Sequence, residues 1–310
     1  MKTNNELKFK NLVQLQKHFS NKQRCVEHLE GLRWGAERCC VHCGSVKTYV
    51  CKGFGKYKCA DCKLRFSVTT GTFFENTKVP LTKWFVAMYL CLSHKKGVSS
   101  CQLARDLGVT QKTAWFILHR VRQLVISKAP QMLLEGMVEV DEAYLGGLEK
   151  NKHKSKRLTT KGAGINKGKK VLVGAVERNG RAVVKFIERP TKEHLLPFIK
   201  KIIKPLTTVY TDEFYAYGQL SDSFNHASIN HSAKQYVRGN VHTNTIENFW
   251  SVFKRCIHGT YHQVSDKHIQ QYANEITFRF STRKQSEQRR FDNALGNCEG
   301  RLKYAALIQK

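Results

Sequence analysis

The chain has 310 residues, of which 53 are Lys or Arg and 24 are Asp or Glu, so its formal net charge is +29. A surplus of this size repels itself in a folded protein and is best tolerated beside a polyanion, so we expect a nucleic acid partner; an anionic membrane surface is the weaker alternative. The longest apolar stretch, residues 84–92, is about half as long as a membrane-spanning helix, and residues 1–10 contain no apolar signal-peptide core. We therefore expect a cytoplasmic protein with no membrane partner.

The first predicted segment, residues 1–35, is a helical lead-in, because Leu12, Leu15 and Phe19 recur at helical spacing. The next segment, residues 36–75, is rich in turns and is predicted to form a small domain of short strands. Two Cys-x2-Cys turns lie in this segment with 15 residues between them, and their four thiols belong to Cys40, Cys43, Cys59 and Cys62.

This cysteine spacing predicts one structural Zn²⁺ ion. Two Cys-x2-Cys turns supply four thiolates, the tetrahedral donor set of a zinc ribbon, and four thiolates leave no open position for catalysis. The alternative, a set of ordinary buried cysteines, rarely falls into two matched pairs. Because the segment is too small for a substantial core of its own, we expect metal binding to supply much of its folding free energy.

Residues 76–132 are predicted to be helical and to contain a helix–turn–helix motif for DNA binding. Thr82 is predicted to cap the first helix of the region, Ser99 or Ser100 the second and Thr110 the third, with Gly108 ending the second helix. The first turn of the last helix is where a recognition helix meets base edges. The predicted DNA-contacting residues there are Thr110, Gln111, Lys112 and Thr113. The alternative is a plain helical hairpin with a solvated basic face.

From residue 133 the pattern changes to strands and helices, and residues 133–285 are predicted to form an α/β domain, followed by a basic C-terminal tail over residues 286–310. The second and third strands are predicted to pair as a hairpin. The expected strands cover residues 137–144, 170–176, 182–187 and 207–211; the expected helices cover residues 192–204 and 244–257, and a further helix begins near residue 266.

A basic insertion, residues 149–170, separates the first two of these strands. It has few apolar residues, so it is predicted to be a loop. Its cations, among them Lys154, Lys156 and Arg157, are predicted to contact DNA phosphates; the alternative is a solvated charged loop.

Acidic side chains occur at three points of the α/β domain. Glu139 and Asp141 share one face of an apolar strand, because side chains alternate along a strand. Asp212 ends another strand, and Glu247 lies on an amphipathic helix two turns before Lys254. Each acid alone is explained by a salt bridge, but the combination favours two hard divalent cations, Mg²⁺ or Mn²⁺, that together clamp the attacking and leaving oxygens of a phosphodiester. The lysine is predicted to hold a nearby phosphate.

The chain resembles the DDE transposases of bacterial insertion sequences that carry an N-terminal zinc ribbon, the Merlin-related, ISXO2-like group. The resemblance covers nearly the whole chain and is carried by four motifs: CVHC…CADC, VEVDEAYLGG, VYTDEFYAY and HTNTIENFWSVFKRCIHGTYHQVSDKH. It implies an RNase H-like catalytic domain, with a mixed sheet flanked by helices, behind the zinc ribbon and the helix–turn–helix region. It also implies a bacterial, nucleoid-associated enzyme that cleaves double-stranded DNA at transposon ends with two Mg²⁺ or Mn²⁺ ions. The freed 3′-hydroxyl is then joined to target DNA, and a homo-oligomer holds the ends.

The resemblance assigns the first acid to Asp141, the second to Asp212 and the lysine to Lys254. Glu247 is predicted as the third acid because it lies on the same side of its helix as Lys254. The 34 residues between Asp212 and Glu247 also resemble the spacing in other DDE enzymes. Some members of the group have Asn in place of this Glu. The alternatives that stay open are Asn244 and Asn248 as the third ligand, and His242 as a group beside the metal or phosphate.

Two other classes of function also remain open. A non-catalytic DNA-binding regulator with a zinc ribbon and a helix–turn–helix motif would need zinc only and would leave the acids unexplained. Another RNase H-like nuclease would share the carboxylates but would cut DNA without joining it.

Overall fold

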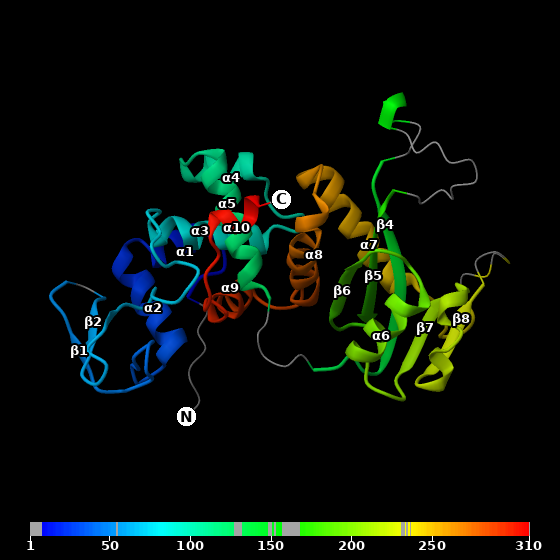
Figure 1. Ribbon diagram of the computed structural model, residues 1–310, viewed down its shortest axis with the longest axis horizontal. Helices are drawn as coiled ribbons and strands as arrows, with labels where there is room; N and C mark the ends of the chain where they lie inside the picture. Colours follow the sequence, from blue (N-terminus) through cyan, green and yellow to red (C-terminus); the bar gives the residue numbers. More distant parts are fainter. Residues whose placement is uncertain are drawn as a thin grey trace. The chain divides into compact units, whose positions relative to one another are not determined.

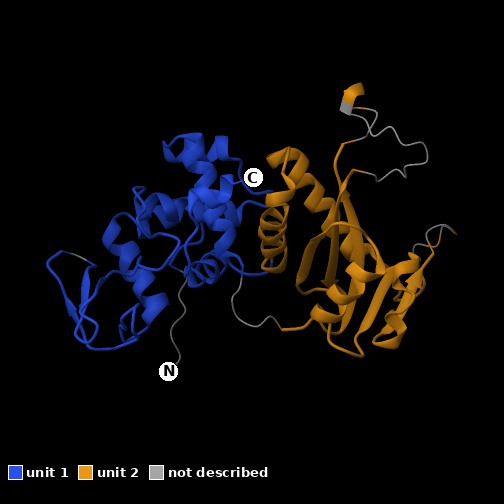
Figure 2. Ribbon diagram, in the orientation of Figure 1, with its two compact units in different colours: residues 1–129, 284–310 blue, residues 130–283 orange. Residues whose placement is uncertain are grey.

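The computed structural model describes residues 8–53, 55–126, 132–147, 151, 153–156, 168–230, 233, 235 and 237–309. The chain divides into two compact units, one made of Met1–Ala129 with Lys284–Lys310 (unit 1) and the other of Pro130–Arg283 (unit 2) (Figure 2). The segment predicted as a basic tail therefore belongs to unit 1. None of the described helices is both long enough and apolar enough to cross a membrane.

Unit 1 begins with the two lead-in helices and a small sheet. Its helices are α1 (Leu12–His18), α2 (Lys22–Trp34), α3 (Leu81–Ser93), α4 (Ser100–Leu107), α5 (Gln111–Leu124), α9 (Glu287–Gly296) and α10 (Tyr304–Ile308) (Figure 1). Its strands are β1 (Thr48–Val50), β2 (Tyr57–Cys59) and β3 (Arg65–Phe66), which pair antiparallel in the order β1-β2-β3.

Helix caps explain where α4 and α5 begin and where α4 ends. The Ser99 side chain accepts a hydrogen bond from the backbone N–H of Gln102 at 3.1 Å, and Thr110 accepts one from Thr113 at 3.3 Å. Gly108 ends α4 in the left-handed conformation, with φ +59°, which glycine adopts without strain. These predicted caps are confirmed.

The predicted Thr82 cap is wrong. Helix α3 begins at Leu81 with Pro80 as its N-cap, so Thr82 lies within the first turn. Proline suits this position because it has no N–H and its ring fixes φ near the helical value.

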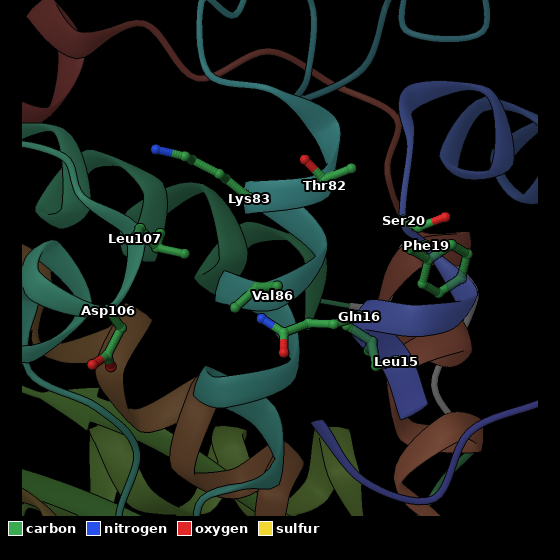
Figure 3. Close-up of a pocket in the computed structure, with 9 residues that line it drawn as sticks. All are labelled: Leu15, Gln16, Phe19, Ser20, Thr82, Lys83, Val86, Asp106 and Leu107. Atoms are coloured by element: carbon green, nitrogen blue, oxygen red, sulfur yellow. The ribbon is translucent and has the colours of Figure 1, made fainter. Parts of the chain in front are cut away.

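An aromatic cluster forms the centre of unit 1. The Phe85 ring lies 4.7 Å from Phe19 and 5.3 Å from Phe291 of α9, and Phe9 contacts the same group. A pocket of about 320 Å³ opens beside this cluster. Side chains of α1, α3 and α4 line it, among them Gln16, Val86 and Leu107 (Figure 3). None of the residues predicted as catalytic lies there.

Unit 2 is a five-stranded mixed sheet with helices on both faces. Its strands are β4 (Met137–Leu145), β5 (Lys170–Glu177), β6 (Ala182–Ile187), β7 (Thr208–Asp212) and β8 (Asn225–Ile229), in the order β6-β5-β4-β7-β8. The β6-β5-β4 side is antiparallel and the β4-β7-β8 side is parallel. Helix α6 (Lys192–Ile202) covers one face, while α7 (Asn244–Cys256) and α8 (Asp266–Ser281) cover the other (Figure 1). The predicted α/β class and the β5–β6 hairpin are confirmed.

Strand β4 directs alternate side chains to the two faces of this sheet. Val138 and Val140 belong to the core under α6, and Ala143 and Leu145 belong to the core under α7. Asp141 therefore points to the α7 face, since side chains of one parity share a face.

Candidate active site

Asp141 and Asp212 lie on neighbouring parallel strands. Glu139 of β4 is in register with Tyr210 of β7, so Asp141 and Asp212, each two residues further on, reach the same level of the sheet. Burial and the negative charge of Asp212 raise the pKa of Asp141 to about 7. The structure thus brings together the two acids that the sequence placed on separate strands.

Glu247 and Lys254 of α7 lie near enough to Asp141 for their charges to act on its carboxyl group. The charge of Glu247 also raises the pKa of Asp141, whereas the charge of Lys254 lowers it. Both side chains are exposed, and the Thr243 hydroxyl donates a hydrogen bond to Glu247 Oε1 at 2.8 Å. All four predicted catalytic residues therefore share one neighbourhood, with the third acid and the lysine at its open side.

The two asparagine alternatives lie on the same part of α7. Asn244 begins the helix and Asn248 follows Glu247, and both are exposed. Residues three and four apart share a face of a helix, so Asn244, Glu247 and Asn248 all line that face. The third ligand remains a prediction.

Glu142 was not predicted as a site residue. It points to the opposite face from Asp141, where its Oε1 accepts a hydrogen bond from the buried Tyr217 hydroxyl at 2.6 Å. Burial raises the pKa of Glu142 to about 8, and the charges of Asp141 and Asp212 contribute to the rise. The only sequence signal was the second acid of the Asp-Glu pair, because Tyr217 lies 75 residues away.

Glu139 and His242 lie together, with Glu139 inside the protein and His242 half-buried beside it. Glu139 is completely buried and forms an ion pair with Arg178, whose Nε lies 2.7 Å from Glu139 Oε1. The His242 Nδ1 atom is 3.4 Å from the same oxygen. The salt bridge considered for each acid alone is therefore found at Glu139.

The donor set of the acidic site suits hard divalent cations. Carboxylate oxygens are the ligands that Mg²⁺ and Mn²⁺ prefer, and the raised pKa of Asp141 reflects a buried acid, crowded by other acids, that a cation would relieve. Among the described residues, only the four ribbon cysteines form a cluster whose ligand atoms all lie within 4.8 Å of one another. The acids are spread more widely than the ligands of a single ion.

The four cysteines of the ribbon fit one zinc ion. The sulfurs of Cys40 and Cys62 are 3.7 Å apart and those of Cys43 and Cys59 are 3.6 Å apart. A tetrahedron with Zn–S bonds of about 2.3 Å has edges of about 3.8 Å. Hydrogen bonds from the backbone N–H groups of Cys62 and Asp61 lower the pKa of the Cys59 thiol to about 6, whereas the pKa values of Cys43 and Cys62 are raised, in part by the neighbouring thiols. The fit to zinc therefore rests on the sulfur geometry.

The predicted DNA-contacting residues lie partly at the surface. Thr110, Gln111 and Lys112 are exposed at the start of α5, and Thr113 is half-buried. The Tyr304 ring of α10 packs on Phe116, 5.5 Å away, and the Lys112 ammonium lies 5.0 Å from the same ring. The exposed surface of α5 is therefore concentrated in its first turn.

The structure describes only part of the basic insertion. Lys154 is exposed and lies with Lys156 in a short 3-10 turn, Lys154–Lys156. The prediction for Arg157 falls outside the described residues.

Comparison with known proteins gives two family matches. The ISXO2-like transposase domain matches residues 133–281, and the transposase zinc-ribbon domain matches residues 20–65. An uncharacterized protein in transposable element ISH50 of Halobacterium salinarum is 32% identical over 251 residues, covering 77% of this chain and 84% of that protein. An uncharacterized transposase-like protein of Haemophilus influenzae is 36% identical over 88 residues, covering 28% of this chain and 70% of that protein.

Two solved structures share low similarity with the chain. A protein in the cryo-EM structure of the simian T-cell lymphotropic virus intasome with PP2A regulatory subunit B56 gamma is 15% identical, with a TM-score of 0.29. That match covers 62% of this chain and 65% of the other. A protein in the Mos1 strand transfer complex is 12% identical, with a TM-score of 0.29, covering 69% of this chain and 78% of the other. On its domain matches and its ISH50 relative, the chain belongs to the ISXO2-like transposases, with a transposase zinc ribbon ahead of the ISXO2-like domain.

Proposed function

We propose that this chain is a DNA transposase that cleaves the ends of its element and joins the freed 3′-hydroxyl to target DNA. The observation that carries the proposal is the meeting of Asp141 and Asp212 at one level of the sheet, with the charges of Glu247 and Lys254 of α7 acting on Asp141. Acids crowded in this way, in a chain of net charge +29, suit a metal-dependent reaction on a polyanion.

Three acids would hold the metal ions in this proposal: Asp141, Asp212 and Glu247. Asp141 is central to the set in one respect, because the charges of both other acids raise its pKa. Two bound Mg²⁺ or Mn²⁺ ions supply Lewis-acid stabilisation of the attacking and leaving oxygens. Water attacks the phosphodiester at the end of the element, and the released 3′-hydroxyl then displaces a target phosphodiester in line. Lys254 binds a neighbouring phosphate and orients the strand.

The DNA partner is bound outside these acids as well. We assign base contacts to the first turn of α5 and phosphate contacts to the basic insertion, including Lys154, Lys156 and Arg157. Synapsis of two ends requires at least two active sites, so the functional form is a homo-oligomer on DNA.

Cleavage of a duplex that carries the end of the element tests the proposal. Wild-type protein with Mg²⁺ or Mn²⁺ is expected to release a 3′-hydroxyl strand and join it to a second duplex, whereas Asp212→Asn is expected to do neither. Glu213→Gln is the matched control, because Glu213 is an exposed acid next to Asp212. Equal cleavage by wild type and Asp212→Asn would contradict the proposal, and cleavage without joining would favour a nuclease.

A further inference from the structure

Helix α7, which carries the third acid, receives its N-terminal cap from strand β4. The first amides of a helix lack partners within the helix, and Thr243, the N-cap residue, makes no side-chain cap hydrogen bond. Instead, Glu139 Oε2 accepts a hydrogen bond from the backbone N–H of Ile246 at 2.9 Å, and its Oε1 accepts one from the Thr245 hydroxyl at 2.9 Å. The negative charge also stands at the positive end of the helix dipole.

Arg178 extends this contact to the strands that hold both aspartates. Its Nε donates to Glu139, two residues before Asp141, and its Nη2 donates to the His242 carbonyl at 3.0 Å, just before α7. Its guanidinium lies 4.7 Å from the ring of Tyr210, two residues before Asp212. One guanidinium therefore contacts all three segments that lead to the predicted metal ligands.

A second contact fixes α7 one turn further along. Gly174 of β5 is the partner of Asp141 in the sheet register, and the ring of Trp250 lies directly on it. A Cβ atom at Gly174 would come within 2.7 Å of Trp250 Cζ2. The helix thus approaches the sheet closely beside Asp141, and a lateral shift at its N-terminus changes where Glu247 lies.

We propose that Glu139, held by Arg178, is a positioning residue that sets the α7 carboxylate against Asp141 and Asp212. This inference rests on the proposed function. Glu139 is not itself a metal ligand, because it is completely buried and both of its oxygens accept hydrogen bonds from the protein. Without its charge, the Ile246 amide and the Arg178 guanidinium lose a buried acceptor, and the start of α7 moves to find water or another partner.

Mn²⁺ binding to the full-length, zinc-loaded protein tests this role, with free Mn²⁺ followed by electron paramagnetic resonance. Wild type is expected to bind two ions. Glu139→Gln is expected to lower the affinity for one Mn²⁺ ion at least about tenfold, because loss of a group that orients a ligand has an effect of this size, and to leave the affinity for the other within about twofold. Glu247→Gln is expected to lower the affinity for the same ion. The double variant is expected to bind no more weakly than Glu247→Gln alone, because Glu139 acts through Glu247.

Three further variants separate positioning from stability. Glu275→Gln removes another completely buried acid of unit 2, the ion-pair partner of Arg279, and is expected to lower the unfolding temperature with both Mn²⁺ affinities retained. Thr245→Val removes one donor to Glu139 without removing a buried charge, so it replaces Glu139→Gln if that variant does not fold. Thr245→Ser keeps the hydroxyl and is expected to bind Mn²⁺ as wild type does.

The outcomes distinguish this inference from the proposed function. If Asp212→Asn loses Mn²⁺ while folded Glu139→Gln and Thr245→Val bind both ions as wild type does, the positioning role is wrong and the proposed function stands. An equal loss of both ions in Glu139→Gln also contradicts a role exerted through Glu247. If wild type and Asp212→Asn bind Mn²⁺ equally, both the proposed function and the positioning role are wrong.

Discussion

Replacing Gly174 by Ala tests how closely α7 must approach the sheet. The added Cβ would lie 2.7 Å from Trp250 Cζ2, whereas ordinary contact begins near 3.4 Å, so the indole has to move by about 0.7 Å. The ring is only 3% exposed and packs between Phe249, 5.0 Å away, and Phe253, 5.6 Å away. It cannot swing into solvent, and the displacement passes to the helix that carries Glu247.

Overpacking of this kind costs about 1–3 kcal/mol, which for a unit of this size lowers the unfolding temperature by roughly 3–10 °C. A catalytic group displaced by nearly 1 Å lowers the rate by about 10- to 100-fold. We therefore expect Gly174→Ala to be folded at 25 °C and to cleave an end-containing duplex at least about tenfold more slowly at saturating Mg²⁺.

Differential scanning calorimetry and single-turnover cleavage measure the two effects. Gly218→Ala is the matched control, since Gly218 has φ −56° and its Cβ would meet the nearest atom at 3.5 Å, an ordinary contact. If the folded Gly174→Ala variant cleaves the duplex at the wild-type rate, the reasoning is refuted, because the position of α7 then does not govern the reaction.

Three further predictions concern the zinc, the acids and the DNA. Removing zinc with a chelator, or Cys59→Ser, is expected to unfold residues 36–75 and make them sensitive to proteolysis while the unfolding transition of unit 2 is retained, because the ribbon has only a small core. Without Mg²⁺ or Mn²⁺, unit 2 is expected to lose stability as pH rises from about 4 to 8, which thermal unfolding measures. Folded Asp141 and Glu142 retain protons that the unfolded chain has released over this range, and Mg²⁺ is expected to reduce the loss. Stability that stays constant with pH would contradict this. Lys112→Ala is expected to reduce the slope of log DNA affinity against log salt concentration by about 1 for any DNA sequence. An unchanged slope would show that Lys112 does not contact DNA phosphate.

Local patterns in the sequence were enough to predict most of unit 2. The alternating strand at β4, the β5–β6 hairpin and the amphipathic helices α6, α7 and α8 all lie within a few residues of their expected bounds. Strand β8 was missed because four of its five residues, Asn225–Ser228, form no apolar alternation and only Ile229 is fully buried. An edge strand of this kind is specified by its pairing with β7 rather than by its own sequence.

The site was predictable in part for the same reason. Asp141 and Asp212 carried a local signal, since each acid follows an apolar strand, but their meeting depends on a parallel register between strands about 70 residues apart. The roles of Glu139 and Gly174 had no local signal. The partners of Glu139 lie 39 to 107 residues away, and the contact of Gly174 with Trp250 exists only once α7 has packed on the sheet.

The way the chain crosses between its units has a consequence for synthesis. Unit 1 is discontinuous, because Pro130–Arg283 is inserted between its two segments, and Phe291 of the second segment stands in the aromatic cluster with Phe19 and Phe85. During translation unit 2 is therefore complete before the core of unit 1 can close. A frameshift or stop codon just after residue 283 would leave unit 2 with all of its residues, beside a unit 1 that lacks Phe291 and so cannot complete its aromatic cluster.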